Sequence, residues 1–367
     1  MNSFCRVLGL SILGVTAAVA ASGQARIVNA RLETRAATRG LEAEMRAFLD
    51  AQTEPAWIGF SVPATAGGHE SCCWNSPADY DGNRCGRCSL ESERGSKVHG
   101  SSVERLSAGA LQLERPAEIV VLLRVADHRI GKVRQFSPDC EVDAGGLRVV
   151  WLTGVKPAES VAQLERLVLA GDFSGRNERH AAEGALSAIA MTGDPAADRA
   201  LERFSAADQP EKLRSQTAFW LGSARGAAGL KTLEAMAKSD PSNHVKEQVA
   251  FAFSVSQEPR ALDDLILMAK EDSSGHVRGQ AMFWLAQKAG HRAAEVISDA
   301  IENDPDTSIK RSAVFALSQL PKDEGVPMLI QVARTNKNRE VRKQAFFWLG
   351  QTNDPRALAF FEEVLAR

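Results

Sequence analysis

The stretch Val277-Arg278-Gly279-Gln280-Ala281-Met282-Phe283-Trp284-Leu285 decides the fold, because altered copies of it recur at a constant spacing. Successive copies begin 32 residues apart (245 minus 213, for example), and a fainter copy begins at Ala181. A constant period of this size is typical of a solenoid of stacked helix pairs, since one pair alone cannot bury its apolar face. Solenoids present long surfaces, so the repeat also favours binding of another macromolecule. The five clear copies begin at Leu213, Val245, Val277, Ile309 and Val341.

Residues 1–25 are typical of a secretory signal peptide. Arg6 supplies a positive charge, an apolar run from Val7 to Ala21 follows, and Gly23-Gln24-Ala25 offers small residues for cleavage. The apolar run is shorter than a membrane span requires. We therefore expect an exported, soluble protein, periplasmic or extracellular, without membrane insertion after signal removal. A retained N-terminal anchor is the alternative.

The composition narrows the class of partner. The formal net charge is −2 and the sequence pI is about 6.4, with no basic tail that would neutralise a polyanion. We therefore expect no nucleic acid partner and no cofactor. All cysteines lie before the repeats, which indicates a domain boundary near residue 155. The expected domains are an N-terminal domain over 26–154 and a solenoid over 155–367.

The N-terminal domain is expected to be a small α+β unit with an antiparallel sheet. Leu41, Met45 and Phe48 share one face at helical spacing, and Pro55 ends this helix. The strand-like runs have apolar, β-branched or alternating composition. They cover residues 57–62, 118–125, 130–136 and 147–152, with Asp127-His128 as a turn.

A cysteine loop over 72–88 interrupts this domain. It is polar and rich in turn residues, so we expect disulfides among Cys72, Cys73, Cys85 and Cys88 to hold it. Adjacent cysteines rarely bond each other, which favours pairing of each of the first two with one of the last two. A zinc site of four thiolates and a redox-active Cys85-x-x-Cys88 remain alternatives. Cys140 is expected to be a buried free thiol, with a place in the disulfide network as the alternative.

The solenoid begins with a capping helix, which starts at Pro157 and ends at Gly171. Six helix–turn–helix units are expected after it. Asp194-Pro195 and Asp354-Pro355 start helices, with the aspartate as N-cap and the proline at the first helical position.

These features resemble the HEAT-repeat superfamily, in the short bacterial form called the PBS-lyase HEAT-like repeat. The resemblance covers residues from about 157 to 367 and rests on a Val/Ile-Arg/Lys-x-x-Ala-x-x-x-Leu-Gly unit followed by Asp-Pro, as in 341–355. The family includes bilin lyase subunits, a diiron hydroxylase and many scaffolds. The hydroxylase requires several His-Glu pairs on the helices, whereas this chain has one, His69-Glu70, outside the repeats. The resemblance therefore implies the fold rather than an enzyme activity.

Each repeat is numbered below from its first residue as position 0. Positions 0, 4 and 8 should face the partner helix, whereas position 6 points almost opposite. Position 6 holds the phenylalanine row, which is Phe219, Phe251, Phe283, Phe315 and Phe347. Position 3 holds the glutamine row, which is Gln216, Gln248, Gln280 and Gln344, with Ser312 in the fourth repeat. We interpret the two rows as a groove on the concave face for an extended or helical polypeptide. Packing of the phenylalanines between repeats is the alternative.

Other rows have structural interpretations. Trp220, Trp284 and Trp348 alternate with alanines at position 7, which favours packing between repeats. Basic residues at position 1 should pair with the acidic row at position −5. His244 and His276 should be exposed turn residues.

No catalytic constellation emerges, since His69 and Tyr80 have no base or nucleophile partner at a meaningful spacing. The sequence thus predicts an exported interaction scaffold or adaptor that binds a protein or peptide partner, without a catalytic or metal site. The alternative is a redox, metal-sensing or enzymatic role of the Cys72–Cys88 loop, with the solenoid as its docking arm.

Overall fold

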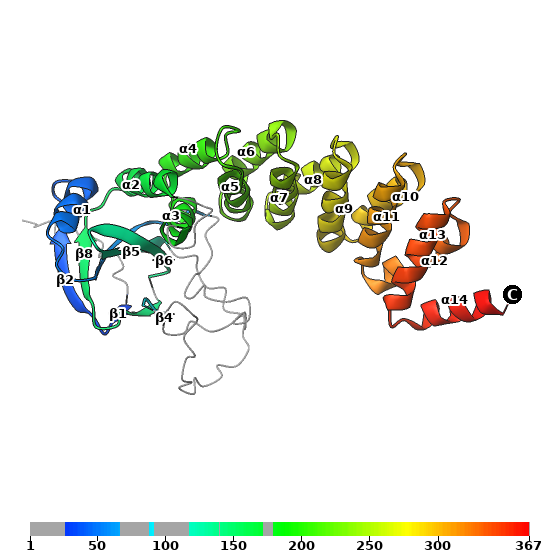
Figure 1. Ribbon diagram of the computed structural model, residues 1–367, viewed down its shortest axis with the longest axis horizontal. Helices are drawn as coiled ribbons and strands as arrows, with labels where there is room; N and C mark the ends of the chain where they lie inside the picture. The colour runs from blue at the N-terminus through cyan, green and yellow to red at the C-terminus, as the bar shows by residue number, and fades with distance from the viewer. Residues whose placement is uncertain (1–25, 67–87, 92–116, 139, 172–178, 367) are drawn as a thin grey trace, which may run out of the picture.

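The computed structural model describes residues 26–66, 88–91, 117–138, 140–171 and 179–366. A sheet lies at the N-terminal end of a curved row of helix pairs (Figure 1). The expected signal peptide over 1–25 and nearly all of the cysteine loop fall outside these residues, so both stay predictions.

The main sheet has five strands in the order β2-β8-β3-β5-β6. Only β3, β5 and β6 pair antiparallel, whereas β8 pairs parallel with both β2 and β3. The expected antiparallel sheet is therefore wrong for half of the pairings. Strands that are distant in sequence are not joined by a tight turn, so the residue pattern does not indicate whether they pair parallel or antiparallel. The strands are β2 (Arg31–Ala36), β3 (Ala56–Pro63), β5 (Glu118–Ala126), β6 (Arg129–Phe136) and β8 (Arg148–Thr153).

A second, three-stranded parallel sheet in the order β1-β7-β4 packs near one face of the main sheet. Its strands are β1 (Arg26–Val28), β7 (Glu141–Asp143) and β4 (Cys88–Ser89). A separate apolar cluster lies on this side, with Trp57, Val120 and Val142 completely buried. The short strands thus cover a second, smaller core.

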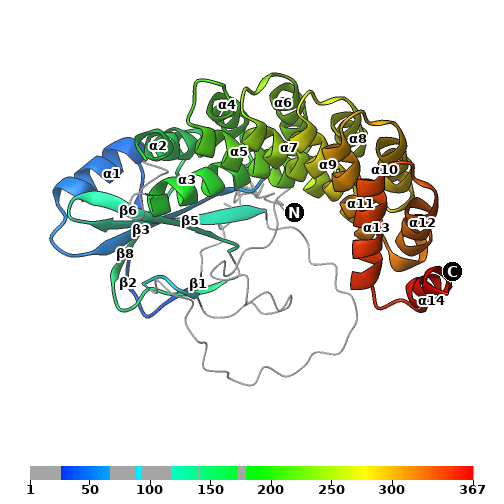
Figure 2. The same cartoon turned by 45° about the vertical axis from the view of Figure 1, so that its right-hand side comes forward.

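The other face of the main sheet is covered by helices α1 (Leu41–Asp50), α2 (Pro157–Ala170) and α3 (Arg179–Met191), as Figures 1 and 2 show. One apolar core runs from this face through α2 and α3 into the repeats. Two backbone hydrogen bonds join the parts, from Thr65 to Met191 (2.9 Å) and from Gly193 to Pro63 (2.7 Å). The sheet is therefore continuous with the first end of the solenoid.

Within the described residues, the solenoid contains six helix pairs after α2, as the period predicts. The inner helices α5, α7, α9, α11 and α13 form the concave side, and the helices α4, α6, α8, α10 and α12 form the outer layer (Figures 1 and 2). The pairs are α3 with α4 (Pro195–Phe204), α5 (Glu211–Ala224) with α6 (Gly226–Ser239), α7 (Asn243–Val255) with α8 (Arg260–Glu271), α9 (Gly275–Ala289) with α10 (His291–Asn303), α11 (Thr307–Ser318) with α12 (Lys322–Thr335), and α13 (Arg339–Gln351) with α14 (Pro355–Leu365).

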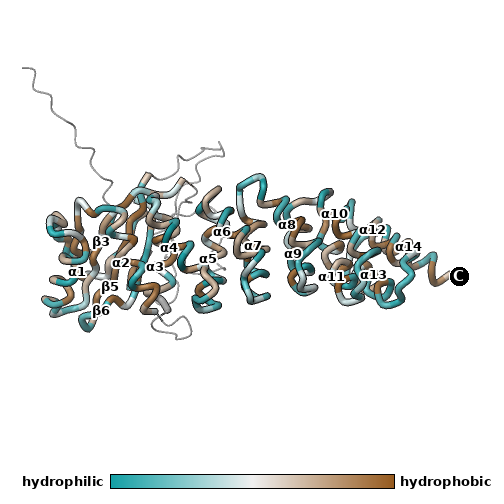
Figure 3. The backbone as a smooth tube through the Cα atoms, turned by 90° about the horizontal axis from the view of Figure 1, so that it is seen from above, coloured by the Kyte–Doolittle hydropathy of each residue, from teal (hydrophilic) through white to brown (hydrophobic). Residues whose placement is uncertain are grey.

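The outer helices of the solenoid are amphipathic, and apolar and polar residues alternate along the tube in Figure 3. Val277, Ala281 and Leu285 at positions 0, 4 and 8 are completely buried, as the helical geometry predicts. No further pair stacks on the last helix, α14, within the described residues. This helix turns Phe360 inward, with its ring 5.3 Å from that of Phe346, and leaves Val364 41% exposed.

The helix starts use the predicted capping chemistry. Asp194 and Asp354 accept hydrogen bonds from the backbone N–H two residues on, and a proline follows each of them. Inner helices are capped three residues before position 0. The side chains of Ser242, Ser274 and Asn338 there each accept from the N–H at position 0. Capping therefore fixes the start of the inner helices α7, α9 and α13, whereas α5 begins after Pro210 without a side-chain cap.

Candidate functional site: an aromatic surface on the concave face

The phenylalanine row lies on the five inner helices α5 to α13. Four of its members are half-buried, and Phe347 at the C-terminal end is 54% exposed. Because positions 0, 4 and 8 bury the opposite side of each helix, position 6 emerges at the concave surface.

The rings form one continuous series, which we call the aromatic ladder. Neighbouring centroids are 4.5–6.0 Å apart, and the contacts alternate between stacked, tilted and edge-on geometry. The ladder runs in the order Trp220, Phe219, Phe251, Trp284, Phe283, Phe315, Trp348 and Phe347.

The ladder follows a unit of two repeats rather than one. Phe251 has Ala252 beside it, and its ring packs 4.5 Å from Trp284 of the next repeat. Phe283 has Trp284 beside it and meets that ring edge-on, and its other side stacks on Phe315. The small residue at position 7 leaves room for the next tryptophan, so large and small residues must alternate.

Both interpretations of the phenylalanine row thus describe part of the arrangement. The rings pack against one another between repeats, and they also remain half-exposed on the concave side. The tryptophans do pack between repeats as predicted. They lie at the edge of the core rather than inside it, since all three are only half-buried.

The glutamine row runs beside the ladder and is half-buried. Gln216 donates to Glu183 Oε1 at 2.8 Å. The amides of Gln248, Gln280 and Gln344 make no hydrogen bond within the described residues. Three amides, each with donors and an acceptor, therefore border the aromatic surface.

The basic row at position 1 is used inside the solenoid. Arg214 lies 2.8 Å from Asp240, Lys246 lies 3.0 Å from Asp272, and Arg278 lies 3.0 Å from the aspartate of the following repeat. The predicted ion pairs between repeats are therefore confirmed in three steps of the stack. These cations are occupied and do not form an anion-binding stripe.

His244 and His276 are exposed, as predicted for turn residues. His276 Nε2 lies 3.3 Å from Glu247 Oε1 on the neighbouring inner helix. No group of three or more His, Cys, Asp or Glu side chains in the described part of the chain is placed to hold a metal ion. The described helices also include none long and apolar enough to cross a membrane.

The prediction of a free thiol at Cys140 is wrong, because this buried cysteine is disulfide-bonded. Its partner is a cysteine whose side chain lies outside the described residues. The sequence interpretation paired the four loop cysteines with one another and left Cys140 as the odd one. The fold brings a cysteine-bearing strand to the same place, since the backbone of Cys88 pairs with Val142. The remaining cysteines of the loop, with His69 and Tyr80, lie outside the described residues.

Glu91 attaches the segment 88–91 to the main sheet. It accepts hydrogen bonds from Trp57 Nε1 at 2.8 Å and from Arg124 Nη2 at 2.8 Å. Burial by itself raises the pKa of this carboxyl group, but the bonds from Arg124 and Trp57 outweigh burial and leave the pKa below its ordinary value. The arrangement is a structural contact that the sequence analysis did not single out.

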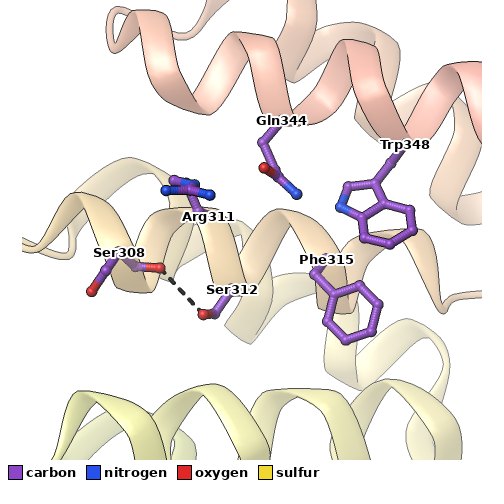
Figure 4. A pocket seen from close by; sticks show the side chains of 6 residues that line it. All are labelled: Ser308, Arg311, Ser312, Phe315, Gln344 and Trp348. Atoms are coloured by element: carbon purple, nitrogen blue, oxygen red, sulfur yellow. Dashed lines mark hydrogen bonds between the residues drawn. The ribbon is translucent and has the colours of Figure 1, made fainter.

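A hollow of about 550 Å³ lies on the concave side between α11 and α13 (Figure 4). The sequence analysis identified the phenylalanine, glutamine and tryptophan of this lining but not Arg311. A cation at position 2 occurs only in the last two repeats, so it forms no row along the solenoid. The lining residues are Ser308, Arg311, Ser312, Phe315, Gln344 and Trp348.

The fold defines a class, an α-solenoid of HEAT-like helix pairs that follows a small α+β unit. Residues 294–367 match the family model of HEAT repeats. No curated protein matches the sequence.

Two solved structures are similar to the chain. Human deoxyhypusine hydroxylase in complex with glycerol is 16% identical, over 56% of this chain and 90% of that chain, with a TM-score of 0.25. The complex of CpcE and CpcF of phycocyanin lyase from Nostoc sp. PCC7120 is 20% identical, over 53% of this chain and 76% of that chain, with a TM-score of 0.30.

Proposed function

We propose that this protein is an exported interaction scaffold whose concave face binds a polypeptide partner along the aromatic ladder. HEAT repeats generally serve as protein-interaction scaffolds. The observation that carries the proposal is the continuous, half-exposed series of eight rings bordered by amides without partners in the described residues. Aromatic side chains dominate the binding energy of many protein interfaces, because they bury large areas with few rotatable bonds.

The dimensions suit a peptide segment. Five inner helices at about 8–10 Å spacing give a ladder of roughly 40 Å. An extended chain rises about 3.3 Å per residue, so the ladder has room for roughly a dozen residues. Amide side chains both donate and accept, which matches the alternating N–H and C=O groups of a peptide backbone. The glutamine row therefore complements the rings without requiring a particular partner sequence.

Two observations support export. Residues 1–25 have the pattern of a secretory signal, and the disulfide at Cys140 is typical of an oxidising compartment. The scaffold would then act in the cell envelope or outside the cell.

The test compares two matched variants in affinity capture from envelope extract, followed by direct binding measurements with the purified partner. Phe347→Ser removes an exposed ring of the ladder, and Leu267→Ser removes an apolar side chain of similar exposure from α8 in the outer layer (54% and 45% exposed). We expect Phe347→Ser to weaken binding by about tenfold, the equivalent of about 1.4 kcal/mol, and Leu267→Ser to leave it unchanged. Equal binding by wild type and Phe347→Ser, or equal loss in both variants, would contradict a site on the ladder.

A further inference from the structure

The concave surface changes its charge from one end to the other. Position 2 of the successive repeats holds Glu183, Ser215, Glu247, Gly279, Arg311 and Lys343. The acidic members lie toward the sheet, and the basic members lie on the last two inner helices. Glu247 already has a partner in His276. The free positive charge of the face is thus concentrated between α11 and α13, where the 550 Å³ hollow opens.

Arg311 is the strongest feature of this hollow. It is exposed, and within the described residues it makes no hydrogen bond or ion pair. Glu340 in the first turn of α13 pairs with Lys343 at 3.0 Å. Lys343, Arg339 and Arg311 all hold the pKa of Glu340 below its ordinary value, the hydrogen bond from Lys343 being the largest cause. Three cations thus face one carboxylate, which leaves a positive excess for an incoming anion.

The hollow also offers neutral N–H donors. Trp348 Nε1 is buried and has no hydrogen-bond partner within the described residues, and the Gln344 amide lies beside it (Figure 4). If the amide oxygen turns toward the indole, the amide NH₂ faces the hollow; otherwise the indole N–H itself is unpaired. A buried donor without a partner is costly, so the orientation that turns the amide oxygen to the indole is favoured. The Gln344 NH₂ group is then the neutral N–H donor of the hollow.

The walls next to these donors are apolar. Phe315 and Trp348 lie with their centroids 5.0 Å apart, at an interplanar angle of 37°. Their exposed faces belong to the aromatic ladder and suit an aliphatic or aromatic side chain. The hollow therefore combines one charged group, one neutral donor and one apolar wall within reach of the same peptide segment.

We propose that the hollow between α11 and α13 binds a carboxylate side chain of the partner polypeptide, with Arg311 as its charge partner and the Gln344–Trp348 pair as its N–H donor. The apolar neighbour of that acidic residue packs on Phe315 and Trp348. This inference rests on the proposed peptide-binding function and specifies the partner: an apolar segment that carries an acidic residue. The acidic residue fixes the direction of the segment, because the sheet end of the face carries the opposite charge.

The first experiment is selection from a random-sequence peptide display library on the intact chain. We expect wild type to enrich peptides with glutamate or aspartate beside an apolar residue. Arg311→Gln should enrich apolar peptides without this acidic preference, whereas Arg260→Gln, which removes an exposed arginine from the outer helix α8, should select like wild type. Because Arg311 is exposed, its variants are expected to unfold at the same temperature as wild type. This thermal unfolding measurement serves as the folding control.

The second experiment measures affinities of two blocked synthetic peptides from the selection, which differ only in glutamate versus glutamine. Wild type should bind the glutamate peptide about tenfold more tightly, a difference of about 1.4 kcal/mol, and this preference should fall as salt is raised. Arg311→Gln should bind both peptides equally, and Arg311→Lys should keep part of the preference.

The outcomes separate the two proposals. Equal affinity of wild type for both peptides, with binding lost in Phe347→Ser, would overturn the carboxylate site and leave the groove in place. An acidic preference that survives in Arg311→Gln would overturn the assignment of Arg311. Selection of no peptide by wild type, or binding of inorganic phosphate alone, would overturn both.

Discussion

At the residue scale, three aspartates at position −5, Asp240, Asp272 and Asp304, each contact two parts of the solenoid. Asp240 Oδ1 accepts from the backbone N–H of Ser242 at 2.8 Å, which shapes the turn before α7. Both of its oxygens also accept from the guanidinium of Arg214 in the preceding repeat, at 2.8 and 3.1 Å. One carboxylate thus fixes its own turn and the spacing to the neighbouring pair. The arrangement recurs at Asp272 and Asp304.

This dual contact predicts that breaking the Arg214–Asp240 ion pair lowers the stability of the fold strongly. The side chains of Arg214 and Asp240 are only 6% and 2% exposed. Arg214→Met leaves a buried carboxylate without its cation, and we expect a loss of about 3 kcal/mol in the free energy of unfolding, measured with urea. Lys310→Met is the matched control. Lys310 occupies the same position but faces Asn336 and bonds only the Glu302 carbonyl, so its replacement should cost less than about 1 kcal/mol. Equal losses would contradict a special role of the buried pair.

The disulfide at Cys140 and the free thiol expected from the sequence predict opposite changes in the number of titratable thiols when Cys140 is replaced. Replacing a disulfide-bonded cysteine releases its partner, so Cys140→Ser should raise the number of titratable thiols in the unfolded, non-reduced protein by one. A free thiol at this position would instead lower the number by one. Titration under denaturing, non-reducing conditions distinguishes the two, and mass spectrometry of the wild-type protein would identify the partner cysteine.

Contacts of single residues could be predicted from the sequence where the same residue type recurs at the same position of successive repeats. A cation at position 1 and an acid at position −5 recur with the period, and a stacked period brings neighbouring repeats into register, so their pairing follows. Cys140 and Arg311 have no such support. The partner of Cys140 depends on how β4 and β7 pair, and Arg311 gains its role only from the hollow that the neighbouring helix encloses.

At the element scale, α14 depends on its N-cap residue, Asp354. Asp354 accepts from the Arg356 guanidinium at 2.7 and 2.9 Å and from the Arg356 backbone N–H at 2.9 Å. These bonds lower the pKa of Asp354 to about 2 from 3.8, the side-chain bond being the larger cause. Because the pKa in the folded state is depressed, the cap stabilises α14 fully above pH 3.8. This contribution is lost as the pH falls through 2.

A titration by carbon-13 NMR of the Asp354 carboxyl group checks this cap. We expect a midpoint near 2 in wild type and a midpoint closer to 3.8 in Arg356→Ala, where the charged donor is gone and the backbone N–H remains. The helical signals of α14 should weaken over the same pH range in each protein. A wild-type midpoint near 3.8 would show that the arginine does not hold the cap.

The elements that the sequence predicted are those with a buried face. Strands β3, β5, β6 and β8 and helix α2 carry apolar residues at a regular spacing, and their predicted ranges agree with the structure within a few residues. The strand β2 is almost fully exposed, so it has no alternation to detect. The parallel pairing of β8 could not be predicted from the residue pattern either, because it depends on contacts between segments 92 and 117 residues apart (148 minus 56 and 148 minus 31).

At the scale of the whole molecule, the sheet serves as the N-terminal cap of the solenoid. Terminal repeats must cover their open face, and here the main sheet covers α2 and α3 in one continuous core. The contact is closest at Gly184 in α3, where an added Cβ would lie 2.2 Å from the carbonyl oxygen of Val133 in β6. Only glycine permits this approach of helix to strand without a shift of the backbone.

Gly184→Ala therefore tests the coupling of the two parts. Alanine favours a helix over glycine by about 0.5–1 kcal/mol, but the clash with a backbone atom should outweigh this gain and lower the stability by about 1–3 kcal/mol. Gly350→Ala in α13 is the matched control, because open space surrounds that position and only the helical gain should remain.

Hydrogen exchange resolved by segment should show faster exchange in β6, α2 and α3 of Gly184→Ala, with α11 and α13 unchanged. Solenoid stability is transmitted mainly between neighbouring repeats. Uniformly faster exchange through α13 would mean that the sheet and all six pairs unfold as one unit, and unchanged exchange in β6 would mean that the sheet folds independently of the solenoid.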